Sequence, residues 1–192
     1  MTEGRIKGVK SKVYNGIAYR STLEADTAET LDKLGIPFEY EKRRITLLDS
    51  FQCPYQKKKV VHITYTPDFE LSPFIILECK GFETPEWRLK KKYVFKYLME
   101  REPYAYFYQI KDARGQLLQA LDTHWIRMGY AVKVTSKPSK KNPSVSQIFD
   151  SIEDAFNKLN LKGKPIGALM RSFTGKTEFV YGYNWKLKKL KL

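Results

Sequence analysis

Apolar positions first recur at helical spacing just after residue 20. They fall on one face of a helix, at Leu23, Thr27, Leu31 and Leu34. Ser21 and Glu24 are three residues apart, the spacing of a capping box, and Gly35 suits the position just past a helix end. The pattern therefore predicts a helix over residues 21–34.

A second helix is predicted from residue 84 onward. Thr84 can cap it, Pro85 suits its first position, and Glu86 favours the positive end of its dipole. Its apolar stripe consists of Trp87, Val94 and Leu98. Its first turns are basic, with Arg88, Lys90, Lys91 and Lys92. Further helices are predicted over residues 117–128, 151–159 and 165–173.

Short apolar or alternating runs between these helices predict strands. They cover residues 36–48, 60–65, 74–79, 104–110 and 131–135, with charges interrupting the first of them and a hairpin tip or loop over residues 50–59. Strands that alternate with helices in this way are typical of an α/β layer fold with a mixed sheet. We therefore predict that fold class for the first 136 residues.

The composition changes after residue 136. Residues 137–146 are rich in Lys, Pro and Ser and predict a basic linker. Beyond it, two short helices around a Gly-containing turn are the minimum of a helix-turn-helix. We therefore predict an α/β domain over residues 1–136, a linker over 137–146, and a small, mainly helical DNA-binding module over 147–192.

Charge narrows the class of partner. The chain has 35 Lys and Arg against 21 Asp and Glu, a formal net charge of +14. This excess favours a polyanion, nucleic acid first and an anionic membrane second. Residues 137–192 alone carry 12 basic against 4 acidic residues. Two cysteines fit a reducing compartment, and no apolar run reaches the length of about 18 residues that would span a membrane, so we expect a cytoplasmic protein that binds nucleic acid.

The strongest candidate for chemistry is Pro67-Asp68 followed, after nine residues, by Glu78-Cys79-Lys80. Glu78 and Lys80 are two apart on a predicted strand and so point to one face, and a hairpin can bring Asp68 close to them. Two carboxylates offer the hard oxygen ligands that suit Mg²⁺ or Mn²⁺. Such a metal can hold a phosphate and activate water, while a lysine can orient that water. The group meets the needs of phosphodiester hydrolysis.

Each of these residues also has an ordinary structural interpretation. Glu24 can simply cap its helix through Ser21, or it can complete a metal site. Asp68 can be a turn aspartate, and Glu78 with Lys80 a surface ion pair on an edge strand. The predicted strand–turn–strand context, the upstream glutamate on a helix and the basic helix just downstream favour the catalytic alternative.

Four blocks of the sequence together resemble the PD-(D/E)xK nuclease superfamily and, within it, the phage endonuclease I family, which resolves four-way DNA junctions. The blocks are residues 19–24 (YRSTLE), 34–41 (LGIPFEYE), 65–69 (YTPDF) and 78–81 (ECKG). The resemblance implies a phage or bacterial metal-dependent DNA endonuclease with a restriction-endonuclease-like mixed sheet flanked by helices. It places Glu24, Asp68 and Glu78 at the acidic metal positions, Lys80 at the catalytic lysine and the Cys79 carbonyl at a main-chain metal ligand.

The same resemblance implies an intertwined dimer in which the helix glutamate serves the other subunit. Residues 45–64 form a longer segment than that family leads us to expect. This difference argues against the intertwined arrangement. Junction resolution and double-strand breaks both need two cuts, so two-fold symmetry independently favours a homodimer.

The last helices and the closing Tyr181–Lys186 resemble the modular DNA-binding repeat of homing endonucleases. Predicted DNA contacts are therefore Arg88, Lys90 and Lys91 on the basic helix and Lys164, Arg171 and Lys176 in the tail. Three functions remain open: a Mg²⁺-dependent endonuclease for branched DNA, with Mn²⁺ able to substitute; a homing-type nuclease that cuts or nicks a particular duplex site; and a non-catalytic DNA-binding protein.

Overall fold

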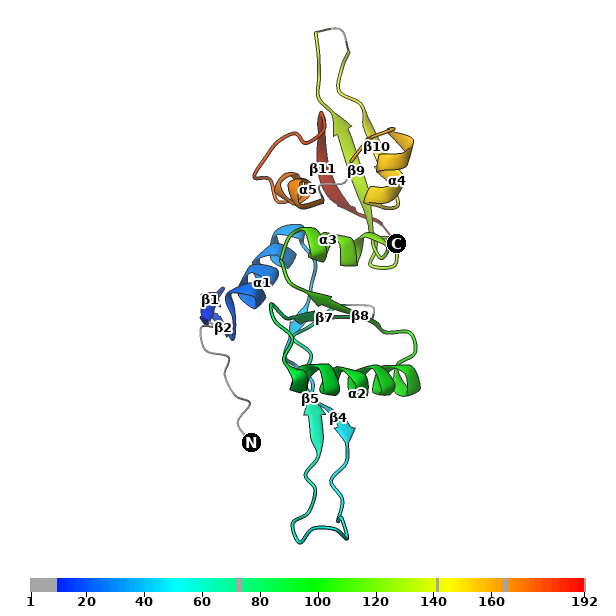
Figure 1. The fold of residues 1–192 in the computed structure, drawn as a ribbon. Coiled ribbons are helices and arrows are strands. Elements are labelled where there is room, and N and C mark those ends of the chain that lie inside the picture. Colours follow the sequence, from blue (N-terminus) through cyan, green and yellow to red (C-terminus); the bar gives the residue numbers. More distant parts are fainter. Residues whose placement is uncertain (1–9, 72–73, 141, 164–165, 192) are drawn as a thin grey trace. The chain divides into compact units, whose positions relative to one another are not determined.

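The computed structural model describes residues 10–71, 74–140, 142–163 and 166–191 (Figure 1). Its contacts divide the chain into two compact units. Unit 1 consists of Met1–Ile36 and Asp112–Leu192, and unit 2 of Pro37–Lys111. The predicted boundaries at residues 136 and 146 therefore fall inside unit 1 rather than between the two units.

Unit 2 is built on a mixed sheet, which agrees with the predicted α/β class. Its elements are β3 (Glu39–Tyr40), β4 (Ile45–Leu48), β5 (Ile63–Tyr65), β6 (Phe69–Leu71), β7 (Ile75–Cys79), α2 (Pro85–Arg101) and β8 (Tyr106–Ile110). The sheet has the order β3-β6-β7-β8, in which only the β7–β8 pair is parallel among the described strands. Because parallel neighbours need a crossover, α2 connects β7 to β8. β4 and β5 pair separately as an antiparallel hairpin.

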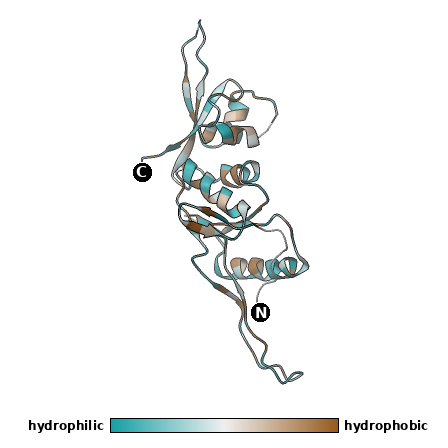
Figure 2. Cartoon of the chain, turned by 90° about the vertical axis from the view of Figure 1, so that its left-hand side faces the viewer, coloured by the Kyte–Doolittle hydropathy of each residue, from teal (hydrophilic) through white to brown (hydrophobic). Residues whose placement is uncertain are grey.

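α2 forms where the sequence predicts it. The Thr84 hydroxyl accepts the Trp87 N–H at 3.1 Å, and Pro85 occupies the first turn. Figure 2 shows hydrophobic and hydrophilic turns mixed along this helix. Its apolar residues pack in one cluster with β4, β5 and β7: Ile45, Tyr65, Ile76, Trp87, Val94 and Leu98. α2 therefore covers the face of β7 that carries Ile76, and Glu78 is two residues further along that same face.

Arg43, just before β4, lies between two carboxylates of unit 2. Its guanidinium pairs with both oxygens of Glu102, at 2.5 and 2.9 Å, and its Nε lies 2.6 Å from Glu70. The hydrogen bonds from Arg43 lower the pKa of Glu102, whereas burial raises the pKa of Glu70 despite the same neighbour. The cluster ties the turn before β4 to the end of α2.

We expect Glu102→Gln to remove a stabilising contribution that depends on pH. A carboxyl whose pKa is lowered in the folded chain stabilises it above the unfolded pKa of about 4.3, and this stabilisation is lost as pH falls. The free energy of unfolding of the wild type should exceed that of Glu102→Gln by about 0.5–1 kcal/mol at neutral pH. The difference is small because the ion pair with Arg43 is partly exposed to solvent. Urea unfolding of both proteins between pH 7 and pH 3 measures the difference. A difference that stays constant over this range would contradict the assignment.

Unit 1 combines the N-terminal helix with the C-terminal part of the chain. Its elements are β1 (Lys12–Tyr14), β2 (Ile17–Tyr19), α1 (Thr22–Leu34), α3 (Gly115–Asp122), β9 (Tyr130–Ser136), β10 (Ser146–Phe149), α4 (Ile152–Lys158), α5 (Ile166–Phe173) and β11 (Tyr183–Lys189). β10 and β11 pair antiparallel with opposite edges of β9, and we call these strands the C-terminal sheet. α4 contacts β9 and β10, and α5 contacts β11, so both helices lie against this sheet.

The stretch predicted as a linker is instead the connection of a β-hairpin. Ser136 closes it, with its N–H bonded to the Val145 carbonyl and its hydroxyl accepting the Val145 N–H. At the other end of the loop, the Ser139 N–H donates to the Asn142 carbonyl. Lysine and proline are as typical of a hairpin loop as of a linker, and β10 has too few apolar residues to stand out in the sequence.

Two further predictions differ in their limits. The helix expected over residues 117–128 ends at Asp122, whose carboxylate accepts the N–H groups of Ile152 and Glu153 and thereby fixes the start of α4. The helices α4 and α5 are present, but Pro165, the expected first residue of α5, lies outside the described residues. No helix within the described part of the chain is both long and apolar enough to cross a membrane.

Candidate active site in unit 2

Asp68 and Glu78 lie side by side on neighbouring strands of unit 2. β6 and β7 are antiparallel with Phe69 opposite Leu77, and the next step of that register brings Asp68 opposite Glu78. The Asp68 carboxylate accepts the backbone N–H of Cys79 at 2.7 Å. This confirms that the hairpin brings Asp68 to the Glu-Cys-Lys segment. Asp68 is 9% exposed and Glu78 only 2%, so neither is a surface turn residue.

Lys80 points to the same side as Glu78, as the two-residue spacing predicts. Its ammonium lies 3.2 Å from Glu78 Oε1 and 4.9 Å from the centre of the Trp87 ring. The Lys80 N–H continues the β7–β8 ladder by donating to the Ile110 carbonyl at 2.9 Å. Both the backbone and the side chain of Lys80 are therefore held in place, while a third of the side chain stays exposed.

Burial makes the Glu78 carboxylate unusual. Removal from water raises its pKa, and the nearby charges of Lys80 and Lys90 act in the opposite direction. The Tyr65 hydroxyl also donates to Glu78 Oε2 at 2.8 Å. Two adjacent buried carboxylates repel each other when both are ionised, so positive charge beside them stabilises the ionised form. Lys80, at 3.2 Å from Glu78, supplies part of that charge.

Two residues of this cluster had no assigned role in the sequence. Tyr65 lies at the end of β5 and reaches Glu78 through its hydroxyl. Gln109 pairs with Glu78 in the parallel β7–β8 register, and its side-chain oxygen accepts both Trp87 Nε1, at 3.0 Å, and Lys91 Nζ, at 3.2 Å. The sequence signal that could have identified Gln109 was its polar side chain inside the strand predicted over residues 104–110.

We expect Tyr65→Phe to destabilise the chain by about 1–3 kcal/mol, because it leaves a buried carboxylate oxygen without its donor. Urea unfolding measures this change. The double variant Tyr65→Phe/Glu78→Gln should be less destabilised than the sum of the single changes, since both act on one hydrogen bond. Strictly additive losses would show that the two side chains are energetically independent.

Glu24 belongs to unit 1 and forms the predicted capping box. The Ser21 hydroxyl donates to Glu24 Oε1 at 2.7 Å and accepts the Glu24 N–H at 3.2 Å, and Glu24 Oε2 accepts the Arg20 N–H at 3.1 Å. Gly35 ends the same helix with a left-handed backbone, as predicted. The capping interpretation of Glu24 is confirmed, and its role at a metal remains a prediction.

The chemistry of the donors in unit 2 fits a hard divalent cation. Within the described residues, no group of three or more His, Cys, Asp and Glu side chains is placed to hold a metal ion. Mg²⁺, however, is commonly held by one or two carboxylates, with water and substrate phosphate completing its shell. Asp68 and Glu78 meet that smaller requirement.

The predicted DNA contacts have different surroundings. On α2, Arg88 is exposed and Lys90 is half-buried, whereas Lys91 is tied to Glu83 at 2.5 Å and to Gln109. Lys91 is therefore held beside the site with part of its side chain exposed, and its contact with DNA remains a prediction. In unit 1, Arg171 and Lys176 are exposed. Lys164 lies outside the described residues.

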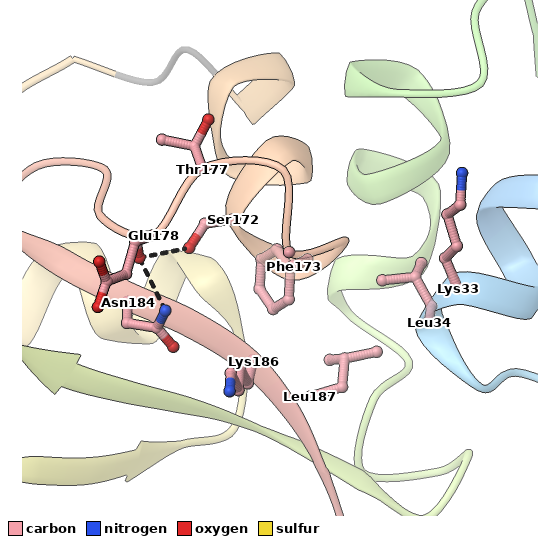
Figure 3. Close-up of a pocket in the computed structure, with 10 residues that line it drawn as sticks. Lys33, Leu34, Ser172, Phe173, Thr177, Glu178, Asn184, Lys186 and Leu187 are labelled. Atoms are coloured by element: carbon pink, nitrogen blue, oxygen red, sulfur yellow. Dashed lines mark hydrogen bonds between the residues drawn. The ribbon is translucent and has the colours of Figure 1, made fainter.

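Unit 1 contains a hollow of about 380 Å³ (Figure 3). It is lined by Lys33, Phe173 and Lys186, among others. Two of its polar side chains, Ser172 and Asn184, both donate to the Glu178 carbonyl. These bonds hold parts of the fold together. The residues for which the sequence predicts hydrolytic chemistry, Asp68, Glu78 and Lys80, lie in unit 2 instead.

Comparison with protein families gives a match to the first half of the chain. Residues 6–104 match the family described as Phage endonuclease I. That stretch spans β1 to the end of α2 and so includes Glu24, Asp68, Glu78 and Lys80. No curated protein and no solved structure matches the chain.

Proposed function

The chain belongs to the phage endonuclease I family, and from this premise we propose that it is a metal-dependent endonuclease that hydrolyses phosphodiester bonds in branched DNA. The observation that carries the proposal is the buried pair Asp68 and Glu78, with Lys80 at 3.2 Å from Glu78. A restriction-endonuclease-like core is proposed for the hairpin β6–β7, the crossover α2 and the strand β8.

Asp68, Glu78 and the backbone carbonyl of Cys79 are the proposed metal ligands, with Mg²⁺ as the cation and Mn²⁺ able to replace it. The N–H and C=O of one strand residue face the same edge, so the carbonyl of Cys79 faces the side on which its N–H meets Asp68. A bound divalent cation would polarise the phosphate and lower the pKa of water. Glu24 is retained as the proposed third acidic residue.

Lys80 is proposed to act on the charge that develops on the phosphoryl oxygens. Its ammonium is held by Glu78 and rests against the Trp87 ring, so it is oriented before substrate arrives. Trp87 is in turn fixed by its bond to Gln109. This support keeps the lysine beside the two carboxylates without a large loss of side-chain freedom on binding.

Incubation of the purified chain with a four-way junction and with linear duplexes of varied sequence tests the function. Each substrate is supplied with Mg²⁺, with Mn²⁺ or with a chelator. Cleavage of the junction in Mg²⁺ and its loss with chelator support the proposal. Cleavage confined to particular linear sequences would favour the second candidate, a homing-type nuclease. The exposed basic residues after position 136 support that candidate.

We also propose that the active form is a homodimer, because one site cuts one strand and junction resolution needs two cuts. The segment between β4 and β5 is the proposed contact, since Phe51 and Val61 on it are 46% and 57% exposed. Sedimentation equilibrium on the 22.5 kDa chain measures the mass. A monomeric mass both alone and on DNA would exclude the dimer.

A further inference from the structure

The exposed face of the C-terminal sheet carries a cluster of lysines at positions where they repel each other. Lys133 of β9 lies directly opposite Lys186 of β11 in the antiparallel register. Directly opposite residues have Cβ atoms about 5 Å apart, and like charges there are destabilising. Lys188 is on the same face, opposite Ala131. Because this pair of lysines is destabilising, we infer that it has a role other than stabilising the fold.

The opposite face of this sheet is the packed one. Val132, Val134 and Trp185 alternate with the lysines and are buried, and α4 and α5 contact the strands. The outer face is polar by contrast. Its remaining members are Thr135 and Asn184, both half-buried, and Ser146 and Ile148, both exposed. A hollow of about 350 Å³ lies beside them, lined by Lys133, Thr135, Asn184 and Lys186 together with Phe179 and the exposed Glu178.

The helices offer much less to a ligand. In α5, the exposed residues are Gly167 and Arg171, whereas Leu169, Met170, Ser172 and Phe173 are buried. A recognition helix needs three or four side chains that reach base edges. The described residues between α4 and α5, 159–163, by themselves exceed the 3–4-residue turn of a helix-turn-helix. The helices therefore serve mainly to support the sheet.

We propose that the outer face of the C-terminal sheet is a binding surface for duplex DNA, with β9 and β11 entering the major groove. The groove is about 12 Å wide and admits a two-stranded β-ribbon. Lys133, Lys186 and Lys188 contact phosphates, and the hydroxyl of Thr135 and the amide of Asn184 face base edges. Asn184 is oriented by its bond to the Glu178 carbonyl at 2.7 Å (Figure 3).

The loop between β9 and β10 extends the same basic surface. Lys137 and Lys140 on it are exposed, and the Lys137 ammonium lies 5.7 Å from the centre of the Phe179 ring. Glu178 is the acidic side chain at the edge of this hollow. This surface rests on the proposed function only in taking DNA as its ligand, because no step of cleavage involves it.

Binding of the full chain to a labelled linear duplex, measured in chelator at several salt concentrations, tests the proposal. We compare Lys186→Gln/Lys188→Gln with the matched control Lys158→Gln/Lys162→Gln, which removes the same charge from exposed positions at the end of α4 and in the turn after it. The sheet variant should bind at least about tenfold more weakly at 0.1 M salt and should reduce the log–log salt slope by about 1.8. The control should stay within about twofold of the wild type.

A third variant separates binding from folding. Lys133→Gln removes the repulsion with Lys186, so it should unfold at a higher temperature and yet bind DNA more weakly. A lower unfolding temperature would show that the lysine pair is not a cost to the fold. Loss of affinity in the helix control with an unaffected sheet variant would overturn the proposal, as would unchanged affinity in both or a preference for anionic phospholipid vesicles over duplex. Failure of the proposed nuclease would instead appear as absence of cleavage with normal duplex binding.

Discussion

Asp68→Asn and Glu78→Gln should each reduce the rate of junction cleavage in Mg²⁺ by roughly a thousandfold if these carboxylates hold the metal. Metal ions contribute several kcal/mol of transition-state stabilisation, and about 4 kcal/mol corresponds to that factor. Both substitutions keep the shape of the side chain. An asparagine oxygen can still accept the Cys79 N–H, so the hairpin β6–β7 should fold as in the wild type.

Binding of the same junction in chelator is the companion measurement. We expect both variants to bind at least as well as the wild type, because each loses a negative charge that faces DNA. Arg44→Gln is a suitable control, since Arg44 is exposed and its Nε bonds only to Thr64 among the contacts that the structure gives it. Cleavage that persists in Asp68→Asn would remove the basis of the site assignment.

Lys80→Ala distinguishes the lysine from the metal ligands. It should lower the cleavage rate strongly, while Mg²⁺ binding measured by calorimetry persists. Because Lys80 also offsets the charge of buried Glu78, the unfolding free energy has to be measured beside the rate. A fall in metal affinity as large as the fall in rate would contradict the role given to Lys80.

Local signals in the sequence were sufficient for most of the elements around the site. Ser21 and Glu24 determine the start of α1, and Thr84 with Pro85 determines the start of α2, because caps depend on neighbours three residues away. The same-face placement of Glu78 and Lys80 follows from strand geometry alone. These features need no knowledge of the rest of the chain.

Long-range pairing could not be predicted in this way. Nothing in the local pattern shows that β11 pairs with β9, because the two strands are separated by α4 and α5 in the sequence. The roles of Tyr65 and Gln109 were missed for the same reason, since each meets Glu78 or Trp87 only through the tertiary fold. The residue pattern and the family resemblance both identified Asp68 and Glu78, but neither identified the side chains that hydrogen-bond around them.

The pairing of the C-terminal sheet prevents a simple test of the predicted DNA-binding module by truncation of the chain. Removal of residues 137–192 would take away both strands that pair with β9 and leave the buried side chains of Val132 and Val134 uncovered. Such a protein is expected to lose the fold of unit 1 rather than simply to lose a DNA-binding module. Point variants are therefore the more informative experiment for this part of the chain.

Trp185→Ala should destabilise unit 1 by about 3–5 kcal/mol, as for other buried tryptophans. Trp185 is fully buried, its ring contacts Phe156 at 5.5 Å and Phe173 at 6.4 Å between ring centroids, and its Nε1 donates to the Val180 carbonyl at 3.0 Å. Folded proteins are stable by only about 5–15 kcal/mol, so this change removes a large share of the total.

Hydrogen exchange resolves where that loss occurs. In Trp185→Ala, the amides of β9, β10 and β11 should exchange much faster than in the wild type, because the ring joins the sheet to the two helices that cover it. The amides of β7 and β8 should change less, since those strands belong to unit 2 and form their own core with α2. Lys189→Ala is the control, as this residue lies on the same strand but is exposed. Equal acceleration in both units would show that they unfold as one, and a loss below about 1 kcal/mol would contradict the central place of Trp185 in the core of unit 1.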